Sequence, residues 1–258
     1  MSCIIAVVQI HRIALASALL FSAGGALAAD TALPSAETIL DRFIEVTGGR
    51  AAYEKRHSEC TVEDIEIANT PIKGTVTTYR RAPSDYYLEL EIPMIGKFRQ
   101  WSDGKLAWSI TPTEGAKLLA GEQLDQALRG ARYNGDLYWR DLCKRVETVG
   151  TEDVDGKPAY IVVRTYKLGK PVTNYYDAAS GLLVKGIAKQ QMASGEVRSE
   201  ILLSDYREEA GILVPHKIIM KSPREERIMT VRTVTVNQEA PPGTFDIPAE
   251  VQALLKKQ

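Results

Sequence analysis

The chain has 258 residues, with 32 basic against 33 acidic side chains, and hydrophobic residues make up 45% of it. This composition is ordinary for a globular protein and argues against a disordered chain, a collagen-like chain and a strongly basic nucleic-acid binder. The net charge of −1 indicates no particular partner. A chain of this length can bury a core within one domain, and closed or half-closed β structures commonly reach this size undivided.

The N-terminus has the order of residues found in secretory signal peptides. Arg12 precedes the apolar run 13–21, and small residues follow, with Ala26 and Ala28 as the third and the last residue before the expected cleavage site. We therefore expect residues 1–28 to be a cleaved signal peptide and the protein to be periplasmic. The alternative is a transmembrane anchor, which needs ~20 consecutive apolar residues and so a longer stretch than this one.

Two cysteines, Cys60 and Cys143, remain in the expected mature chain. In an oxidising periplasm they could pair, or each could be a small buried hydrophobic residue, and the sequence leaves both states open. No C-x-x-C motif is present, which excludes a thioredoxin-like or zinc-ribbon site.

The first mature element is predicted to be a helix that begins after Ser35 and ends at the glycine pair Gly48-Gly49. Ser35 is a favourable N-cap, and Glu37 lies in the first turn, where an acidic side chain stabilises a helix. One face of the helix is apolar and consists of Ile39, Leu40, Phe43 and Ile44. We interpret the glycine pair as a C-terminal cap, since a phosphate-binding loop would precede a helix.

From about residue 58 onward the hydrophobic period changes from 3.6 to 2, which predicts strands separated by short turns. The expected strands are 62–68, 74–81, 85–92, 96–101, 105–110, 145–152, 159–167, 170–176, 182–190, 196–207, 212–221 and 227–237. Helical periodicity interrupts them at 122–132 and 137–143, and 250–258 is read as a short tail. The chain is thus predicted to be mainly β (α+β): a single antiparallel curved sheet or open half-barrel of about a dozen strands with a few lid helices, forming one domain over 29–258.

Motifs for catalysis or metal binding are missing from the mature sequence. Its histidines are only His57 and His216, and no H-x-H, H-E-x-x-H or G-x-S-x-G occurs. The acidic cluster Glu63-Asp64-Glu66 is predicted to face solvent. Two carboxylates could still meet in space, so a dispersed hydrolytic site stays open at this point. Basic residues alternate with acidic ones, which favours a solvated surface over a nucleic-acid groove.

Several strands are apolar on one face and polar on the other. We expect the apolar positions of strands 85–92 and 105–110 to lie together on the concave side of the sheet and to line a cavity; they are Tyr86, Leu88, Leu90, Ile92, Leu106, Trp108 and Ile110. Few helices are predicted, so this face is either a packed core or an apolar cavity under a helical lid.

Two segments resemble the first-half signature of the periplasmic outer-membrane lipoprotein carriers and their relatives. Residues 74–87 read GTVTTYRRAPSDYY, and residues 101–112 read WSDGKLAWSITP. The family has a glycine-led strand ending in Arg, Pro and an aromatic residue, then an S-D-G-K-x-x-W strand. Later segments are similar to the same superfamily: 175–183, 205–206, 211–215 and 237–248. The resemblance implies an open β half-barrel with a helical lid, an apolar cavity for acyl chains, and no cofactor.

In the carriers, an arginine just before the proline of the first signature helps to hold the lid. The matching position here is Arg81 or Arg80, because Ala82 intervenes before Pro83. The longer chain and the helical interlude depart from the family pattern, so the chain resembles a divergent member.

Three hypotheses for the function follow from this reading. The first is a periplasmic binding or carrier protein for lipid acyl chains or lipoproteins, with no catalysis, no metal and no nucleic acid. The second is a sensor or regulatory domain that binds an envelope protein partner, since the same fold occurs in periplasmic proteins that bind an anti-sigma factor. The third is a hydrolase with a dispersed site. Co-purified lipid would favour the first hypothesis, and a stable protein partner without lipid the second.

Overall fold

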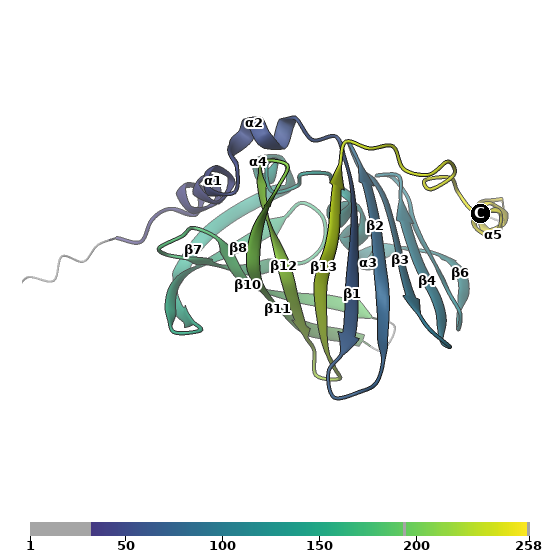
Figure 1. Ribbon diagram of the computed structural model, residues 1–258. Helices are drawn as coiled ribbons and strands as arrows, with labels where there is room; N and C mark the ends of the chain where they lie inside the picture. Colours follow the sequence, from purple (N-terminus) through teal and green to yellow (C-terminus); the bar gives the residue numbers. More distant parts are fainter. Residues whose placement is uncertain (1–31, 193–194, 257–258) are drawn as a thin grey trace, which may run out of the picture. The chain divides into compact units, whose positions relative to one another are not determined.

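Thirteen antiparallel strands form one sheet, in the order β6-β5-β4-β3-β2-β1-β13-β12-β11-β10-β9-β8-β7. The computed structural model describes residues 32–192 and 195–256 (Figure 1). The strands are β1 (Ser58–Ile67), β2 (Lys73–Arg81), β3 (Asp85–Ile92), β4 (Gly96–Ser102), β5 (Ala107–Thr111), β6 (Gly115–Leu118), β7 (Cys143–Val154), β8 (Lys157–Tyr166), β9 (Val172–Asp177), β10 (Leu183–Met192), β11 (Gly195–Glu209), β12 (Ile212–Lys221) and β13 (Glu226–Val236). The helices are α1 (Ala36–Val46), α2 (Gly49–Glu54), α3 (Gly121–Ala131), α4 (Trp139–Leu142) and α5 (Ala249–Leu255).

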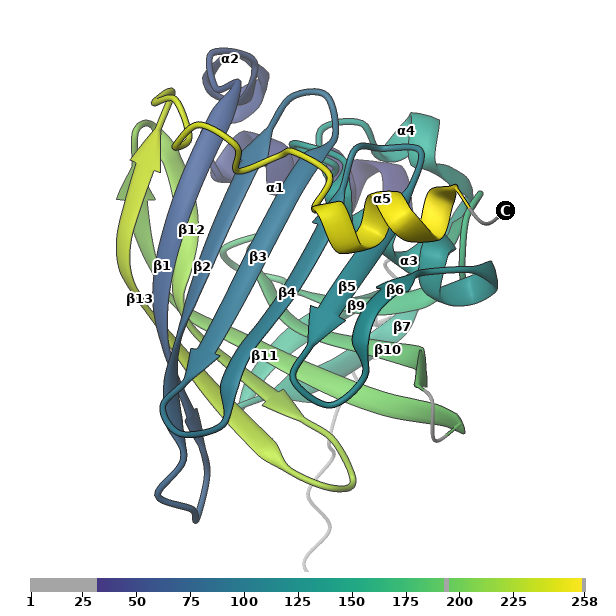
Figure 2. The ribbon, with the colours of Figure 1, turned by 90° about the vertical axis from the view of Figure 1, so that its right-hand side faces the viewer.

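The first and last strands of the chain pair at the middle of the sheet, where β1 lies against β13. Its edges are β6 and β7, which do not pair with each other in the described residues, so the sheet curves without closing (Figure 2). The predicted fold class, an open antiparallel half-barrel with a few helices, is therefore confirmed.

Helix α1 packs its apolar face onto the concave side of the second half of the sheet. Ser35 is its N-cap and accepts a hydrogen bond from the backbone N–H of Thr38, as the sequence predicts. The predicted apolar face is buried among side chains of α4, β8, β9 and β12: Ile39, Leu40, Phe43 and Ile44 join Trp139, Val162, Tyr176 and Ile212. The ring of Phe43 meets that of Tyr176 edge-on, 5.6 Å between centroids.

The corner between α1 and α2 is docked on the start of β12. Thr47 is fully buried, and its carbonyl accepts a hydrogen bond from the N–H of Leu213. Gly48 has φ +136°, and a Cβ there would lie 2.2 Å from the carbonyl oxygen of Gly211. Only glycine permits so close an approach of the two backbones. The glycine pair thus joins two helices, and Gly49 begins α2 instead of only ending α1.

The two helical segments expected at 122–132 and 137–143 are α3 and α4. Helix α3 contacts β4, β5 and β10, so it lies between the two halves of the curved sheet. Arg129 donates hydrogen bonds to the carbonyls of Leu168 and Lys170, and the N–H of Tyr133 bonds to the carbonyl of Pro83. The C-terminal end of α3 is therefore bound to both halves of the sheet through these hydrogen bonds.

The C-terminal segment differs from the prediction of a short tail. Residues 249–255 form helix α5, and Val251 is fully buried against the aromatic residues Trp101 and Trp108. Strand β6 was also not predicted, because its four residues carry only a short alternation. Pairing with β5 is what defines it.

Cys60 and Cys143 are both free, so the unpaired state is the one that the structure shows. The expected signal peptide, 1–28, lies outside the described residues. From Leu33 on, the chain folds as one unit. Among the described helices, none combines the length and the apolar character needed to cross a membrane.

Candidate functional site

A groove of about 810 Å³ lies on the concave face of the sheet. Its floor comes from β1–β4 and β10–β13, and its walls come from α1, α2 and the segment 133–136 after α3. The apolar side chains that line it include Phe43, Tyr53, Ile65, Val76, Leu88, Leu90, Leu183, Leu203, Ile218, Met220, Met229 and Val231. Its volume is within the range of ~300–1,000 Å³ that is typical of small-molecule sites.

The register of β1, β2 and β3 arranges the inward-facing residues in rows across the groove. Glu59 pairs with Arg80, and Arg80 pairs with Tyr86. The next inward row is Thr61, Thr78 and Leu88, and the row after that is Glu63, Val76 and Leu90. Ile65 and its partner on β13, Met229, follow. The groove therefore has charged residues at the end with Glu59 and Arg80 and mainly apolar residues beyond it, apart from Glu63 in the third row and Arg227 past Met229, where Arg227 is paired with Glu225.

Arg56 and Glu59 form an ion pair at the charged end. The Arg56 side chain is only 4% exposed, and its Nη2 donates to Oε2 of Glu59. The other carboxylate oxygen of Glu59, Oε1, accepts a hydrogen bond of 3.3 Å from the Thr61 hydroxyl. The Nε of Arg56 is buried and has no hydrogen-bond partner within the described chain. The hydroxyl of Tyr133, another residue that lines the groove beside Arg56, is also buried without a hydrogen-bond partner in the described chain.

Burial shifts the ionisation of the groove's titratable side chains. It raises the pKa of Glu63, and Arg80 opposes this shift while Glu59 adds to it. Burial also raises the pKa values of Tyr53 and Tyr133 to about 12, so both hydroxyls stay protonated at neutral pH. Burial thus disfavours the charged form of Glu63, which shares a row with Val76 and Leu90.

Three of the predicted cavity residues line the groove: Tyr86, Leu88 and Leu90. Ile92 continues the same alternation on β3, and its side chain lies against Gly74, beyond the lining residues. Leu106 lies in the turn before β5 and is 36% exposed. Whether these residues bind a ligand stays a prediction.

The prediction that Trp108 and Ile110 share a face with Leu90 is wrong. Trp108 pairs with Trp101, and Trp101 pairs with Tyr87, which points to the opposite side from Tyr86 and Leu88. Trp108 and Ile110 therefore lie on the outer face, where α5 covers them. Residues of neighbouring strands lie on the same face of the sheet when the pairing register places them opposite each other. A shift of one residue in this register turns every side chain of a strand to the other face. The alternation of β5 alone does not fix this register.

Arg80 and Arg81 point to opposite sides of β2. The Nη1 of Arg80 donates a 3.2 Å hydrogen bond to the carbonyl of Gly130 in α3, and its guanidinium lies over the Tyr86 ring. Arg81 forms an ion pair with Asp85 and lies over the ring of Phe245. Of the two alternatives for the lid contact, the structure places Arg80 against the helix.

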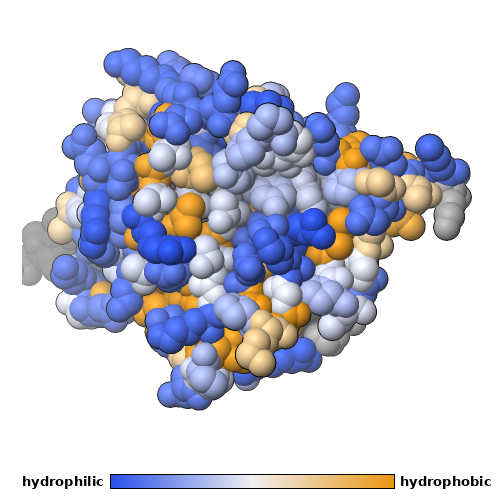
Figure 3. Space-filling model, turned by 45° about the vertical axis from the view of Figure 1, so that its right-hand side comes forward, coloured by the Kyte–Doolittle hydropathy of each residue, from blue (hydrophilic) through white to orange (hydrophobic). Residues whose placement is uncertain are grey.

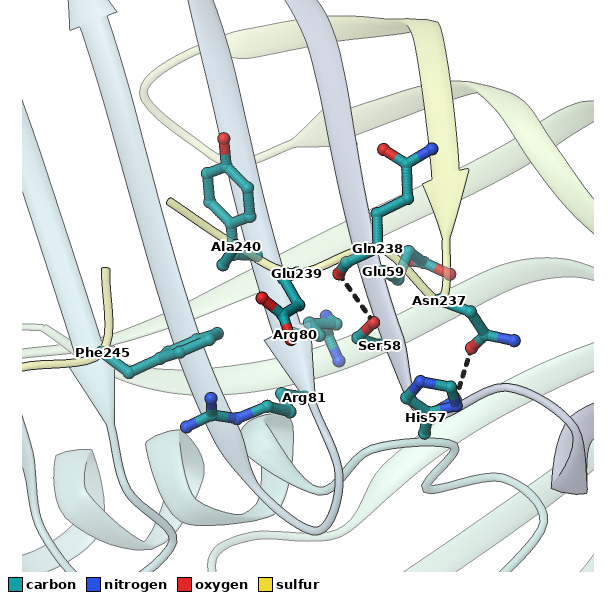
Figure 4. A pocket seen from close by; sticks show the side chains of 11 residues that line it. His57, Ser58, Glu59, Arg80, Arg81, Asn237, Gln238, Glu239, Ala240 and Phe245 are labelled. Carbon is teal, nitrogen blue, oxygen red and sulfur yellow. Dashed lines mark hydrogen bonds between the residues drawn. The ribbon is translucent and has the colours of Figure 1, made fainter. Parts of the chain in front are cut away.

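A second cavity, of about 380 Å³, lies where β1 and β2 meet the segment after β13 (Figure 4). The Ser58 hydroxyl donates to the carbonyl of Gln238, and the N–H of His57 donates to the side chain of Asn237. Glu59 and Arg80 line this cavity as well as the groove. It therefore adjoins the charged end of the groove.

On the face drawn in Figure 3, hydrophobic residues are scattered between hydrophilic ones. Within the described residues, no group of three or more His, Cys, Asp or Glu side chains could hold a metal ion. The groove is consequently the main candidate for a binding site.

The sequence reading missed two parts of the groove. Glu63 was expected to face solvent, but it lines the groove, because the inward positions of β1 are Glu59, Thr61, Glu63 and Ile65. Hydrophobic alternation cannot identify an inward face that carries polar residues. The lining residues of β11–β13 were also not identified. Their inward positions, such as Leu203 and Ile218, follow only from the pairing register.

No family sequence model matches the chain, and no curated protein is significantly similar to it in sequence. Solved structures are similar in fold. A LolA superfamily protein from Nitrosomonas europaea aligns with a TM-score of 0.56 at 13% identity, over 83% of this chain and 99% of that one. The chain has the LolA-like fold. A DUF1329 family protein from Desulfovibrio piger aligns with a TM-score of 0.55 at 14% identity, over 82% and 97% of the two chains.

A domain assigned to outer-membrane lipoprotein sorting from Vibrio parahaemolyticus also shares the LolA-like fold, with a TM-score of 0.52 at 13% identity, over 86% of this chain and 99% of the other. The fold implied by the resemblance of residues 74–87 and 101–112 is thus confirmed. The low identities agree with the prediction of a divergent relative.

Proposed function

We propose that this protein is a periplasmic binding or carrier protein that takes acyl chains of a lipid or lipoprotein into the groove, without catalysing a reaction. The observation that carries the proposal is the groove itself: about 810 Å³ on the concave face, with apolar rows that include Val76, Leu90 and Met229. An acyl chain gains affinity from any apolar surface that excludes water, so such a groove needs no directional contacts along its length.

The expected affinity follows from the area that is removed from water. Each buried CH₂ contributes ~0.8 kcal/mol, so a chain of about a dozen CH₂ groups contributes on the order of 10 kcal/mol before the entropic costs of binding. Methionines at positions 220 and 229 suit this role, because an unbranched thioether side chain adapts to ligands of different shape.

Two further observations support an envelope carrier. The N-terminal 1–28 segment has the residue order of a cleaved signal peptide. One of the solved structures with this fold is assigned to outer-membrane lipoprotein sorting, which makes acyl chains a reasonable cargo class here as well.

The lid in this proposal is α3. Arg80 links it to β2 through the carbonyl of Gly130, and Arg129 links it to the segment between β8 and β9. A bond from a charged donor to a carbonyl contributes ~1.5–3 kcal/mol. Loss of one such bond should shift the lid toward an open state without unfolding the sheet.

The test is native mass spectrometry of the full chain purified from a periplasmic extract, followed by lipid extraction. We expect a fraction of the protein to carry acyl-containing species, and the variant Leu90→Arg to lose them while keeping the circular dichroism spectrum of the wild type. Wild-type protein free of acyl species, or a stable protein partner in their place, contradicts the proposal and favours a regulatory domain.

A further inference from the structure

The charged end of the groove contains more hydrogen-bonding capacity than an acyl chain needs. Arg56 is 4% exposed, and its Nε is buried without a hydrogen-bond partner within the described chain. Arg80, one strand away, lines the same end, and it forms no ion pair with a described carboxylate. Buried donors in folded proteins are nearly always paired, so an unpaired arginine donor that lines a groove indicates a partner that comes from the ligand.

The chemistry of that partner follows from the donors. A guanidinium has a planar set of N–H donors that matches the oxygens of a carboxylate or a phosphate. The three acidic residues that line the groove, Glu59, Glu63 and Asp136, are poor counterparts for a cation, and Asp136 is paired with Arg164. Both oxygens of Glu59 are already in use, by Arg56 and by Thr61. Burial disfavours the charged form of Glu63.

The spacing along the strands also fits an amphiphile. Ile65, in the last apolar row of β1, lies six positions after Glu59, which is in the charged row. At ~3.3 Å per residue this distance is about 20 Å, which is comparable to an extended acyl chain. One molecule can therefore place its head at the arginines and its tail against Ile65 and Met229.

We propose that the ligand is an anionic amphiphile whose carboxylate or phosphate oxygens bind Arg56 and Arg80 while its chain extends toward Ile65 and Met229. This assignment rests on the proposed function and specifies its ligand class. Arg56 selects the head group, and the apolar rows bind an acyl chain whichever molecule carries it.

The experiment measures displacement of a bound apolar fluorophore, 1-N-phenylnaphthylamine, from the full mature chain. The competitors share a decyl chain and differ in the head: decanoate, decyl phosphate, decyltrimethylammonium and decyl maltoside, each below its micellar concentration. We expect at least one of the two anions to displace the fluorophore at a concentration about tenfold lower than the cation does, and the better anion distinguishes a carboxylate from a phosphate.

The variant Arg56→Lys keeps the charge and the pairing with Glu59 but removes Nε–H. We expect it to lower the anion-to-cation ratio several-fold and to leave the decyl maltoside value unchanged. Arg232→Lys is the matched control, because Arg232 lies on the outer face and pairs with Asp64. Arg80→Lys provides a second variant if Arg56→Lys folds poorly by thermal melting.

The outcomes separate the two proposals. Equal displacement by all four heads, a preference for the cation, or a ratio that Arg56→Lys and Arg80→Lys leave unchanged overturns the head-group assignment and leaves the carrier function standing. Failure of every decyl compound and of the fluorophore to bind overturns the carrier function itself.

Discussion

Trp101 and Trp108 stack on neighbouring strands, with their ring centroids 6.3 Å apart and an angle of 18° between the ring planes. The pair lies on the face of the sheet that is opposite to the groove, and Val251 of α5 closes it. This half of the sheet therefore has a small aromatic core on one face and the groove on the other. The aromatic core can stabilise the strands while the inner face stays open.

The variant Val251→Asp tests the contribution of α5. A carboxylate buried against the stacked indoles loses its hydration, so we expect a loss of several kcal/mol or detachment of the helix. Tryptophan emission should shift to longer wavelength, while binding of an apolar fluorophore in the groove should persist at a temperature where the variant is folded. Glu250→Ala, at an exposed position of the same helix, is the control. An unchanged emission spectrum would show that α5 does not cover the indoles in solution.

Leu90→Arg and Ile110→Arg introduce the same charge on opposite faces of the sheet. Leu90 lines the groove, whereas Ile110 is 9% exposed within the aromatic core. We expect Leu90→Arg to abolish fluorophore binding with a modest change in melting temperature, because its guanidinium can reach water in the groove. Ile110→Arg should instead lower the free energy of unfolding by several kcal/mol. If both variants unfold, the inner face is a packed core.

Arg80→Leu and Arg81→Leu separate the two arginines of the lid prediction. Arg80→Leu removes the bond to Gly130 in α3 and should speed release of a bound apolar fluorophore, with a shift of only a few degrees in melting temperature. Arg81→Leu removes a surface pair with Asp85, which contributes little to stability, and should release the fluorophore at the wild-type rate. Stopped-flow measurement of the release rate of the fluorophore from each protein tests this prediction. Identical rates in all three proteins would exclude Arg80 as a lid contact.

Asp177 gives a prediction for the pH dependence of stability. Its Oδ1 accepts hydrogen bonds from the N–H and the hydroxyl of Ser180 at 2.6 and 2.7 Å, and these bonds hold its pKa below the usual 3.8. A pKa that is lower in the folded state gives stability that is present above the unfolded pKa and is lost as the pH falls through the folded pKa. The free-energy difference between wild type and Asp177→Asn should therefore be largest near neutral pH and shrink below about pH 4.

Urea unfolding at pH 3 and pH 6 measures this difference. Asp153→Asn, at an exposed position of β7, is the control. A gap between wild type and Asp177→Asn that grows as the pH falls would contradict the assignment.

The sequence determines much of the fold through local signals. The cap at Ser35, the apolar face of α1 and the limits of β3 and β12 agree with the structure, because capping, periodicity and turn residues act within a few positions. The number of strands and the small number of helices predicted a curved sheet or an open half-barrel, and the resemblance of residues 74–87 and 101–112 implied the same fold.

The residues that line the groove were harder to predict, because they depend on which face of each strand points inward. Trp108 has the alternation of a cavity residue, yet its pairing with Trp101 places it outside. Glu63 has the charge of a surface residue, yet it lies inside. Helix α5 was missed for a related reason, since the aromatic core that it covers forms only when β4, β5 and β6 come together.

The strand order has a mechanical consequence. Strands β6 and β7 are the two free edges of the sheet, and the chain between them is the segment that contains α3 and α4. This segment therefore connects the two edge strands of the sheet directly along the chain. If a larger cargo spreads the sheet, the edges move apart and the segment is drawn taut. The width of the groove and the position of α3 then change together, while the pair of strands β1 and β13 stays at the centre of the sheet.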